Sequence, residues 1–232
     1  MTLEAVLWDM DGTLVDTEPY WIECEFALAD RYQREWSHQH ALNIVGLDLL
    51  DAANYIRTQL ELVELTAEQI RDQLLEGVES LIRQHIPWRA GARELLDLVV
   101  LSGIPNALVT MSYRSFAQPV IDALPRETFS AVVTGEVVSR GKPDPEPYLR
   151  AASLLGVDPT ACLAIEDSPT GCQSAEAAGC TVLAIPNHVP VPPSANRHFL
   201  NSLEGLSVAD LHALLNRPFD SSHSGRPASF EP

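Results

Sequence analysis

The sequence predicts an α/β protein with a mostly parallel sheet and an inserted domain made only of helices. A short apolar run opens the chain, residues 17–88 then show helical periodicity without a convincing strand, and strands alternate with helices from Gly91 onward. Such alternation is typical of a Rossmann-like core. The expected divisions are an α/β core over residues 1–16 and 89–217, a helical cap over 17–88, and a disordered tail over 218–232.

The first strand is expected over Ala5–Trp8, because four apolar residues in a row suit a strand that is buried on both faces. Asp9 and Asp11 follow at once, and since side chains alternate along a strand, both carboxylates leave the same side of the backbone. Gly12 allows a sharp turn, so we expect both acids at the carboxyl end of the strand, where open α/β sheets bind ligands. An isolated Asp-x-Asp-Gly is most often a solvated turn. The apolar strand before it favours a site for a hard cation such as Mg²⁺.

Residues 17–88 are expected to form helices that follow one another. Thr66 and Gln69 have the spacing of a capping box, and apolar residues then recur at steps of three and four: Ile70, Leu74, Val78, Leu81 and Ile82. The segment is too long for an ordinary crossover between two strands. Its length fits a small helical domain inserted after the first strand.

The second half of the chain is expected to contain a repeated unit of helix and strand. The expected strands cover residues 106–110, 130–134, 161–165 and 181–185, and the first and last helices cover about 92–101 and 207–215. Asp144-Pro145 and Ser168-Pro169 each have the pattern of an N-cap followed by a first-turn proline, and Gly156 and Gly179 suit the C-terminal glycine position. Residues 186–196 are expected to form a proline-rich loop.

Polar residues follow the other expected strands. Thr110, Met111 and Ser112 place two hydroxyls and the first backbone N–H groups of a helix after one strand, which suits an anion. Lys142 is the only lysine in the chain, and it lies on a loop that two prolines stiffen. Helix capping and a surface charge are the ordinary structural explanations of these residues.

Glu166 and Asp167 end another strand in two carboxylates, for which a solvated turn is the ordinary explanation. The carboxyl ends of parallel strands meet at one edge of a sheet, so these acids, the hydroxyls, the lysine and Asp9 are expected to lie together. Chance caps and turns would rarely produce that combination at the ends of four strands.

Four motifs in order carry a resemblance to a known family. Asp-x-Asp-Gly-Thr, Thr-x-Ser after a strand, Gly-Lys-Pro-x-Pro and Ile-Glu-Asp-Ser-x-x-Gly resemble the haloacid dehalogenase superfamily of hydrolases, in the β-phosphoglucomutase/phosphatase-like branch with a helical cap inserted after the first motif. The resemblance covers about residues 4–204. It implies a Mg²⁺-dependent phosphatase that hydrolyses a small phosphomonoester, such as a sugar phosphate, through an aspartyl phosphate.

The resemblance also implies roles for individual residues. Asp9 matches the nucleophile, and Asp11 matches the general acid/base that protonates the leaving oxygen and then activates water. The implied ligands of the metal are Asp9, Asp11 through its backbone carbonyl, Glu166 and Asp167. The groups implied to hold the phosphoryl oxygens are Thr110, Met111, Ser112 and Lys142.

Two other functions are considered, a sugar-phosphate mutase and a non-catalytic phosphate-binding protein. The mutases of this family carry a histidine where this chain has Trp21, and basic residues where this chain reads Gly46-Leu-Asp48-Leu-Leu50, so the resemblance favours the phosphatase. A complete set of catalytic residues argues against a protein that only binds. Trp21, Asp48 and Arg89 are candidates for lining the substrate site, with ordinary packing or solvation as the alternative.

Composition restricts the partners. Fifteen Lys plus Arg against thirty-two Asp plus Glu give a net charge of −17, which argues against nucleic acid or anionic membrane as a partner and leaves a small-molecule substrate. The four cysteines have no zinc-ligand or C-x-x-C spacing, and no apolar run reaches the length of a membrane span. We therefore expect reduced, buried thiols in a cytoplasmic monomer.

Overall fold

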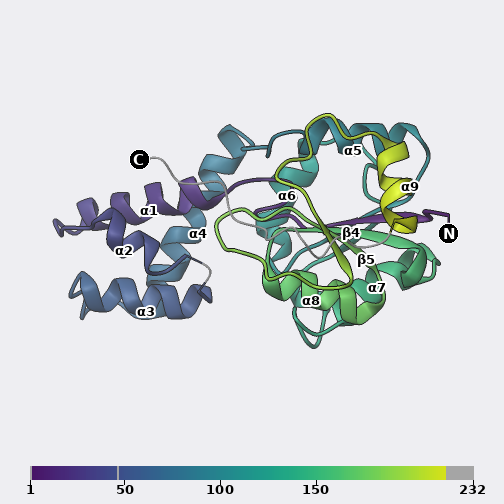
Figure 1. Cartoon of the computed structure of the whole chain (residues 1–232). Coiled ribbons are helices and arrows are strands. Elements are labelled where there is room, and N and C mark those ends of the chain that lie inside the picture. Colours follow the sequence, from purple (N-terminus) through teal and green to yellow (C-terminus); the bar gives the residue numbers. More distant parts are fainter. Residues whose placement is uncertain (1, 46, 218–232) are drawn as a thin grey trace. The chain divides into compact units, whose positions relative to one another are not determined.

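The computed structural model describes residues 2–45 and 47–217 (Figure 1). The tail that is predicted to be disordered, residues 218–232, lies outside the described residues. The described chain divides into two compact units. The core unit runs to Asp16 and resumes at Trp88, and the helical unit covers Thr17–Pro87. Trp88 belongs to the core unit, where its backbone forms an antiparallel bridge with Val15.

One parallel sheet organises the core unit in the part of the chain that the structure describes, and the predicted Rossmann-like fold is confirmed. The spatial order of its strands is β3 (Ala131–Val133), β2 (Asn106–Val109), β1 (Ala5–Trp8), β4 (Cys162–Glu166), β5 (Thr181–Ala184) and β6 (Arg197–Phe199). Strand β1 is central because its register pairs Trp8 with Leu108 of β2 on one side and with Ile165 of β4 on the other. The chain adds strands on one side of β1 and then on the other, so the switch point lies at the end of β1.

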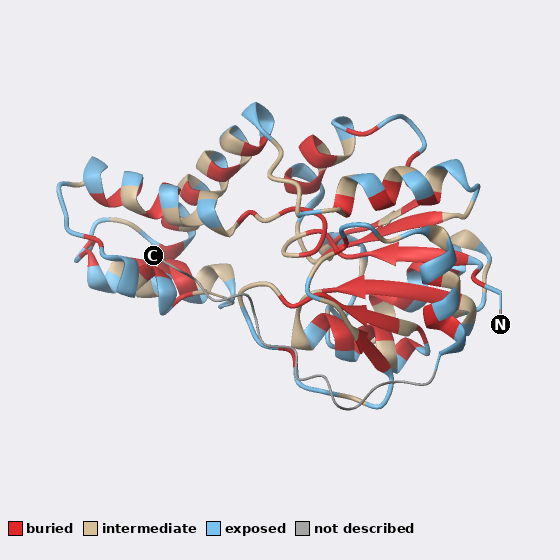
Figure 2. Cartoon of the chain, turned by 45° about the horizontal axis from the view of Figure 1, so that its top comes forward, coloured by how far each residue is buried: buried red, intermediate tan, exposed pale blue. Residues whose placement is uncertain are grey.

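Helices cover both faces of the sheet. The core helices are α5 (Ala92–Leu101), α6 (Arg114–Asp122), α7 (Glu146–Leu155), α8 (Pro169–Ala178) and α9 (Val208–Asn216), with short 3-10 turns η1 (Gly135–Val137) and η2 (Pro159–Ala161). Helices α7 and α8 pack on one face of the sheet, and α5 and α9 lie on the other (Figure 1). The strands between them are almost wholly buried, as Figure 2 shows. A strand buried on both faces is apolar throughout, which is the pattern of Ala5–Trp8.

The ends of the core helices follow the predicted glycines and prolines closely. Gly156 and Gly179 adopt left-handed φ angles at the ends of α7 and α8, and Ser168 caps α8 with Pro169 in its first turn. Helix α7 begins one residue later than predicted. Asp144 still supplies the cap, because its Oδ1 accepts a hydrogen bond from the backbone N–H of Glu146 at 3.0 Å.

Strand β6 is a correction to the predicted topology, which ends with the strand expected at 181–185. The sequence Arg-His-Phe shows no apolar run, and β6 lies at the edge of the sheet, where a single neighbour suffices. Arg197 fastens it, because Nε and Nη2 bind the two carboxylate oxygens of Glu176 on α8 at 2.6 and 2.8 Å. A bidentate ion pair of this kind, with Arg197 buried and Glu176 partly exposed, fixes geometry better than a single contact does.

The helical unit contains α1 (Glu18–Arg31), α2 (His38–Leu42), α3 (Leu49–Gln59) and α4 (Ala67–Gln84). Helix α4 begins at the predicted capping box of Thr66 and Gln69, and its buried residues follow the predicted period. Gly77 allows α1 to approach α4, since a Cβ at this position would lie 2.7 Å from Cys24 Sγ. No helix among residues 2–45 and 47–217 is both long enough and apolar enough to cross a membrane.

Within the described part of the helical unit, one buried carboxyl group has no basic partner. Glu25 on α1 is 4% exposed, and its Oε2 accepts a hydrogen bond of 3.1 Å from the indole N–H of Trp36. Burial raises the pKa of Glu25 to about 7, and the charge of Glu18 adds to the effect. The folded chain therefore keeps this side chain neutral at pH values where the unfolded chain ionises it.

We predict that Glu25 makes the stability of the chain depend on pH. Its stabilising contribution is complete below pH 4.5, the ordinary pKa, and is lost as the pH rises to about 7. The loss corresponds to at most about 3 kcal/mol in the free energy of unfolding. Urea unfolding of the full chain at pH 5 and pH 8 should show that Glu25→Gln loses less stability than the wild type on raising the pH.

The matched control is Glu23→Gln, which removes an exposed carboxylate from the same helix. It should follow the wild-type pH profile. Parallel profiles for Glu25→Gln and the wild type would contradict the prediction.

Candidate active site

The predicted site residues meet at the carboxyl edge of the sheet. Asp9 directly follows β1, Thr110 directly follows β2, and Glu166 is the last residue of β4. The register of the three strands brings these positions side by side. All three are almost fully buried, with Asp9 the most exposed at 7%. Polar groups buried in this way need partners, and the partners define the site.

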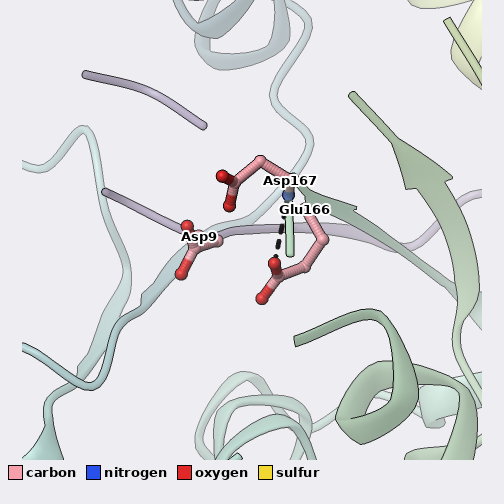
Figure 3. A group of neighbouring side chains, drawn as sticks. All are labelled: Asp9, Glu166 and Asp167. Carbon is pink, nitrogen blue, oxygen red and sulfur yellow. Dashed lines mark hydrogen bonds between the residues drawn. The ribbon is translucent and has the colours of Figure 1, made fainter. Parts of the chain in front are cut away.

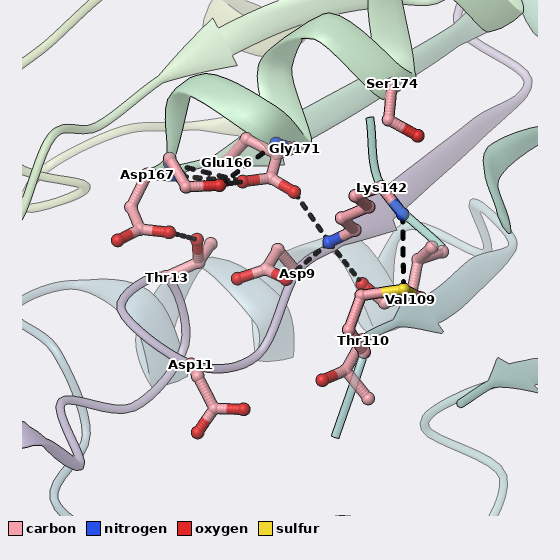
Figure 4. A network of polar contacts seen from close by, with 12 residues as sticks. Asp9, Asp11, Thr13, Val109, Thr110, Lys142, Glu166, Asp167, Gly171 and Ser174 are labelled. Atoms are coloured by element: carbon pink, nitrogen blue, oxygen red, sulfur yellow. Dashed lines mark hydrogen bonds and ion pairs between the residues drawn. The ribbon is translucent and has the colours of Figure 1, made fainter. Parts of the chain in front are cut away.

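Lys142 is the centre of the polar network. Its Nζ donates hydrogen bonds to Asp9 Oδ1 at 2.6 Å, to Glu166 Oε1 at 2.6 Å and to the backbone carbonyl of Val109 at 2.9 Å (Figure 4). An ammonium has three donors, so all of them are used. The side chain is 6% exposed. Lys142 is therefore a buried bridge between the ends of β1, β2 and β4, and not a surface charge.

Glu166 is held by more donors than any other acid of the site. Its Oε1 accepts from Lys142 and, at 2.7 Å, from the hydroxyl of Tyr148, while its Oε2 accepts from the backbone N–H of Asp167 and from Ser168. These bonds occupy both oxygens. The arrangement favours a role for Glu166 in orienting Lys142 over the predicted role as a metal ligand.

Tyr148 is a partner that the sequence analysis missed. It is fully buried on α7, and Lys142 Nζ lies 5.2 Å from the centroid of its ring. The face of the ring attracts the ammonium while the hydroxyl binds Glu166. Burial and the charge of Glu166 raise the pKa of Tyr148 well above its usual value, so the phenol remains a donor. An aromatic residue inside a helix carries no signal of this contact in the sequence.

Three carboxylates form the group that fits a metal ion. Asp9, Glu166 and Asp167 each offer an oxygen, and these oxygens all lie within 4.8 Å of one another (Figure 3). Mg²⁺ prefers carboxylate and carbonyl oxygens, which are the donors present here. Since Glu166 is occupied by its hydrogen bonds, Asp9 and Asp167 are the better side-chain ligands. The donor set therefore fits a hard divalent cation.

The charges of the site support that fit. Burial raises the pKa of Asp9 to about 7, repulsion by Glu166 adds to it, and the ammonium of Lys142 only partly offsets both. The pKa of Asp167 is raised well above its usual value by burial and by the charges of Asp9 and Glu166. Burial alone would lower the pKa of Lys142, but Asp9 and Glu166 outweigh it and raise that pKa. One ammonium does not balance three carboxylates, and a divalent cation would.

Asp11 points away from Asp9 (Figure 4) and is bound to the residues that follow β2. Its Oδ2 accepts a hydrogen bond of 2.7 Å from Ser112 Oγ. The backbone N–H of Ser112 donates to Thr110 Oγ1 at 3.0 Å. Because the oxygen of Thr110 already accepts, its own O–H is left to donate to a ligand. Asp11, Thr110 and Ser112 thus form one connected group beside Asp9.

The first N–H group of helix α6 lies beyond the predicted anion site of Thr110, Met111 and Ser112 and adds nothing to it. Helix α6 begins at Arg114, and the N–H of Arg114 is already bound by the carboxylate of Glu136 at 2.8 and 3.1 Å. This N–H is therefore not available to an anion. Met111 has a further role, because its thioether lies 3.4 Å from the backbone N–H of Lys142 and anchors that loop.

Two motif glycines are explained by carboxylates that lie against them. A Cβ on Gly12 would collide with the carboxylate of Asp167, and Gly12 also has a φ of 84°. A Cβ on Gly171 would collide with the carboxylate of Glu166. Both acids are thus packed directly against backbone, which limits where they can move.

Asp48 and Arg89, two candidates for lining the substrate site, have structural partners. Asp48 caps helix α3, since its Oδ1 accepts from the N–H of Leu50 at 2.8 Å. Arg89 donates to the backbone carbonyls of Gly12, Ile185 and Pro186. The four cysteines are buried free thiols, as predicted, and burial raises the pKa of Cys162 to about 12, which makes a nucleophilic role unfavourable.

Comparisons with known proteins agree with this geometry. The haloacid dehalogenase-like hydrolase family matches residues 6–185 of the chain. Hexitol phosphatase A of Escherichia coli (strain K12) is 34% identical over 220 residues, which cover 90% of this chain and 95% of that protein. The phosphorylated carbohydrates phosphatase of Thermotoga maritima is 31% identical over 178 residues, or 76% of this chain and 82% of that protein. A crystal structure of a family hydrolase from Deinococcus radiodurans R1, with bound phosphate and sodium, has a TM-score of 0.66 and 28% identity and covers 92% of this chain and 95% of its own.

We predict that Gly171→Ala destabilises the chain although it lies in a helix. Alanine normally favours a helix over glycine by about 1 kcal/mol. Here the added methyl group must displace the buried carboxylate of Glu166, and overpacking costs about 1–3 kcal/mol. The free energy of unfolding should therefore fall, as measured by urea denaturation.

Gln173→Ala is the control, because it changes an exposed residue of the same helix and should leave stability almost unchanged. A Gly171→Ala variant as stable as the wild type would show that Glu166 is not packed against this glycine.

Proposed function

The chain belongs to the haloacid dehalogenase-like hydrolases and acts on phosphate esters, and we propose that it is a Mg²⁺-dependent phosphatase of a small phosphorylated carbohydrate. The observation that carries the proposal is the bridge from Lys142 to Asp9 and Glu166 at the sheet edge. It joins a buried carboxylate to a buried ammonium at the strand ends, and Thr110 directly follows the neighbouring strand β2. Those are the groups that a phosphoryl-transfer site requires.

Asp9 is the proposed nucleophile. Lys142 holds its Oδ1, while Oδ2 accepts no hydrogen bond from the residues that the structure describes. Oδ2 is thus the oxygen available to attack phosphorus. In the first step a bond forms between Asp9 and phosphorus, and the bond from phosphorus to the leaving oxygen breaks. The product of this step is an aspartyl phosphate and an alkoxide that needs a proton.

Asp11 is the proposed source of that proton. In its protonated form it transfers a proton to the leaving oxygen, and in its ionised form it then accepts one from a water molecule. The water oxygen attacks phosphorus, the bond to Asp9 breaks, and inorganic phosphate leaves. To do this, the side chain of Asp11 needs to turn from Ser112 toward Asp9. The turn breaks the hydrogen bond that the hydroxyl of Ser112 donates to Asp11.

Charge stabilisation completes the proposal. Mg²⁺, held by Asp9, Asp167 and the backbone carbonyl of Asp11, would neutralise charge that accumulates on the phosphoryl oxygens. The O–H of Thr110 is proposed to bind those oxygens, with the backbone of Met111 and Ser112 beside it. Lys142 is proposed to bind them as well, by exchanging one of its three present acceptors for a phosphoryl oxygen. This local positive charge lets a protein of net charge −17 accept a phosphate dianion.

Relatives support the substrate class. Hexitol phosphatase A and the phosphorylated carbohydrates phosphatase are named for phosphorylated sugars or sugar alcohols, and both match most of this chain. We therefore propose a phosphorylated sugar or sugar alcohol as substrate. The mutase alternative differs in its product, since a mutase moves the phosphoryl group to another position of the sugar and releases no inorganic phosphate.

The proposed function predicts release of inorganic phosphate from hexitol and sugar phosphates in the presence of Mg²⁺ and none in excess chelator. Asp9→Asn should abolish turnover and leave the fold intact, because an amide is a poor nucleophile. Asp122→Asn, which changes a carboxylate at the far end of α6, is the control. Full activity with chelator or in Asp9→Asn would overturn the proposal. An isomerised sugar phosphate as the sole product would assign a mutase.

A separate prediction concerns Asp11. Asp11→Asn should lower kcat/KM for a sugar phosphate by about 10²- to 10⁴-fold, because its alkoxide leaving group needs the proton. The loss should be much smaller for 4-nitrophenyl phosphate, whose leaving group is stable without it. Steady-state kinetics of both substrates give the comparison. Equal losses would show that Asp11 contributes to the metal site and not to proton transfer.

A further inference from the structure

Arg89 binds backbone groups of two loops that border the site. Its Nη1 donates to the carbonyl of Gly12 and, at 2.9 Å, to the carbonyl of Ile185, while Nη2 donates to the carbonyl of Pro186 at 3.4 Å. Gly12 lies in the turn after β1, and Ile185 and Pro186 follow β5. A single guanidinium therefore joins the turn that contains the motif acids to a loop on the far side of β4.

The turn at Gly12 is held from its other side by Asp167. The carboxylate of Asp167 occupies the space that a side chain on Gly12 would need, and its Oδ1 lies 3.4 Å from Thr13 Oγ1. The turn is thus fixed between the carboxylate of Asp167 and the guanidinium of Arg89. The peptide that joins Asp11 to Gly12 lies within this turn. Its carbonyl is a proposed ligand of Mg²⁺, and Arg89 binds the next carbonyl along the chain.

The loop after β5, to which Arg89 binds, is itself held in place by Asp16. The Asp16 carboxylate accepts hydrogen bonds from Asn187 Nδ2 at 3.2 Å and from His188 Nε2 at 2.7 Å. The backbone of Arg89 is fixed as well, since its N–H donates to the carbonyl of Leu14 at 2.9 Å. Arg89 and the loop after β5, which it joins to Gly12, are therefore both held in place by contacts within the core unit.

We propose that Arg89 is a positioning residue for the reaction, holding the peptide between Asp11 and Gly12 in the orientation that the Mg²⁺ site and Asp11 require. The inference rests on the proposed function. Arg89 does not touch the reacting atoms, and it acts through the carbonyl of Gly12. The planar fork of an arginine reaches carbonyls on both loops at once, which a single ammonium on a shorter stem does less well.

The test compares Arg89→Ala and Arg89→Lys with Arg93→Ala. Arg93 is a matched control, because it too is partly buried, binds a carboxylate on Asp97 and donates to a backbone carbonyl, that of Ala123. Mg²⁺ binding to the substrate-free full chain is measured by isothermal titration calorimetry, kcat and KM by phosphate release at saturating Mg²⁺, and folding by thermal denaturation.

We expect Arg89→Ala to weaken Mg²⁺ binding and to lower kcat, each by about 10- to 100-fold, as is typical when a residue that supports metal ligands is lost. KM should change far less. Arg89→Lys should fall between Arg89→Ala and the wild type. Guanidinium ions added to Arg89→Ala below denaturing concentrations should restore part of kcat, and methylammonium should restore less.

A folded Arg89→Ala variant with the Mg²⁺ affinity and kcat of Arg93→Ala would overturn the inference. Should Arg89→Ala fail to fold, Arg89→Lys decides by the same two measurements. If the wild type binds Mg²⁺ but releases no phosphate, the proposed function fails, and the calorimetric comparison still decides whether Arg89 positions the metal ligands.

Discussion

The buried ammonium of Lys142 holds together the carboxyl ends of three strands. Burying this ammonium together with the carboxylates of Asp9 and Glu166 is costly, and that cost determines the structure around them. An unpaired carboxylate in such a place is strongly unfavourable, so each acid requires donors. Glu166 obtains them from Lys142, Tyr148, Ser168 and the backbone, which fixes the carboxylate in one position. Helix α8, which follows β4, passes so close to the carboxylate of Glu166 that only a glycine fits at position 171.

The excess of negative charge at this edge is the reason the site can bind a cation and an anion together. Asp9 and Asp167 are destabilised as anions by burial and by repulsion from neighbouring carboxylates, and a divalent cation would relieve both effects. The phosphoryl group of a substrate would then interact with the cation and Lys142 more strongly than with the distant negative charges of the protein. Local geometry decides binding here, because charges on the outer surface are screened by solvent and salt.

The sequence predicted the elements that depend on local pattern, and missed those that depend on contacts between distant segments. The apolar run of β1, the acids after it and the glycines that end α7 and α8 each have a local physical cause. The bond from Tyr148 to Glu166 and the backbone contacts of Arg89 have no such cause, since the partners lie on other elements and both residue types are common in helices and loops. Strand β6 was missed because an edge strand fastened by an ion pair needs no apolar run. The contact between Glu136 and the first N–H of α6 was not foreseen either, because nothing in the sequence connects Glu136 to Arg114.

The central position of β1 has a consequence for how the chain folds as the ribosome makes it. Strand β1 emerges before its partners, because Val6 pairs with Asn106 and Ala5 with Cys162, and these neighbours emerge only after the whole helical unit. The contacts within the helical unit, such as those of α1 with α4, join residues that are closer in sequence than the partners of β1, and closer contacts form more quickly. We therefore expect the helical unit to fold first during translation, while the apolar strand β1 is still unpaired. Nascent chains of this protein would then be most prone to aggregate, and most in need of a chaperone, until β4 has left the ribosome.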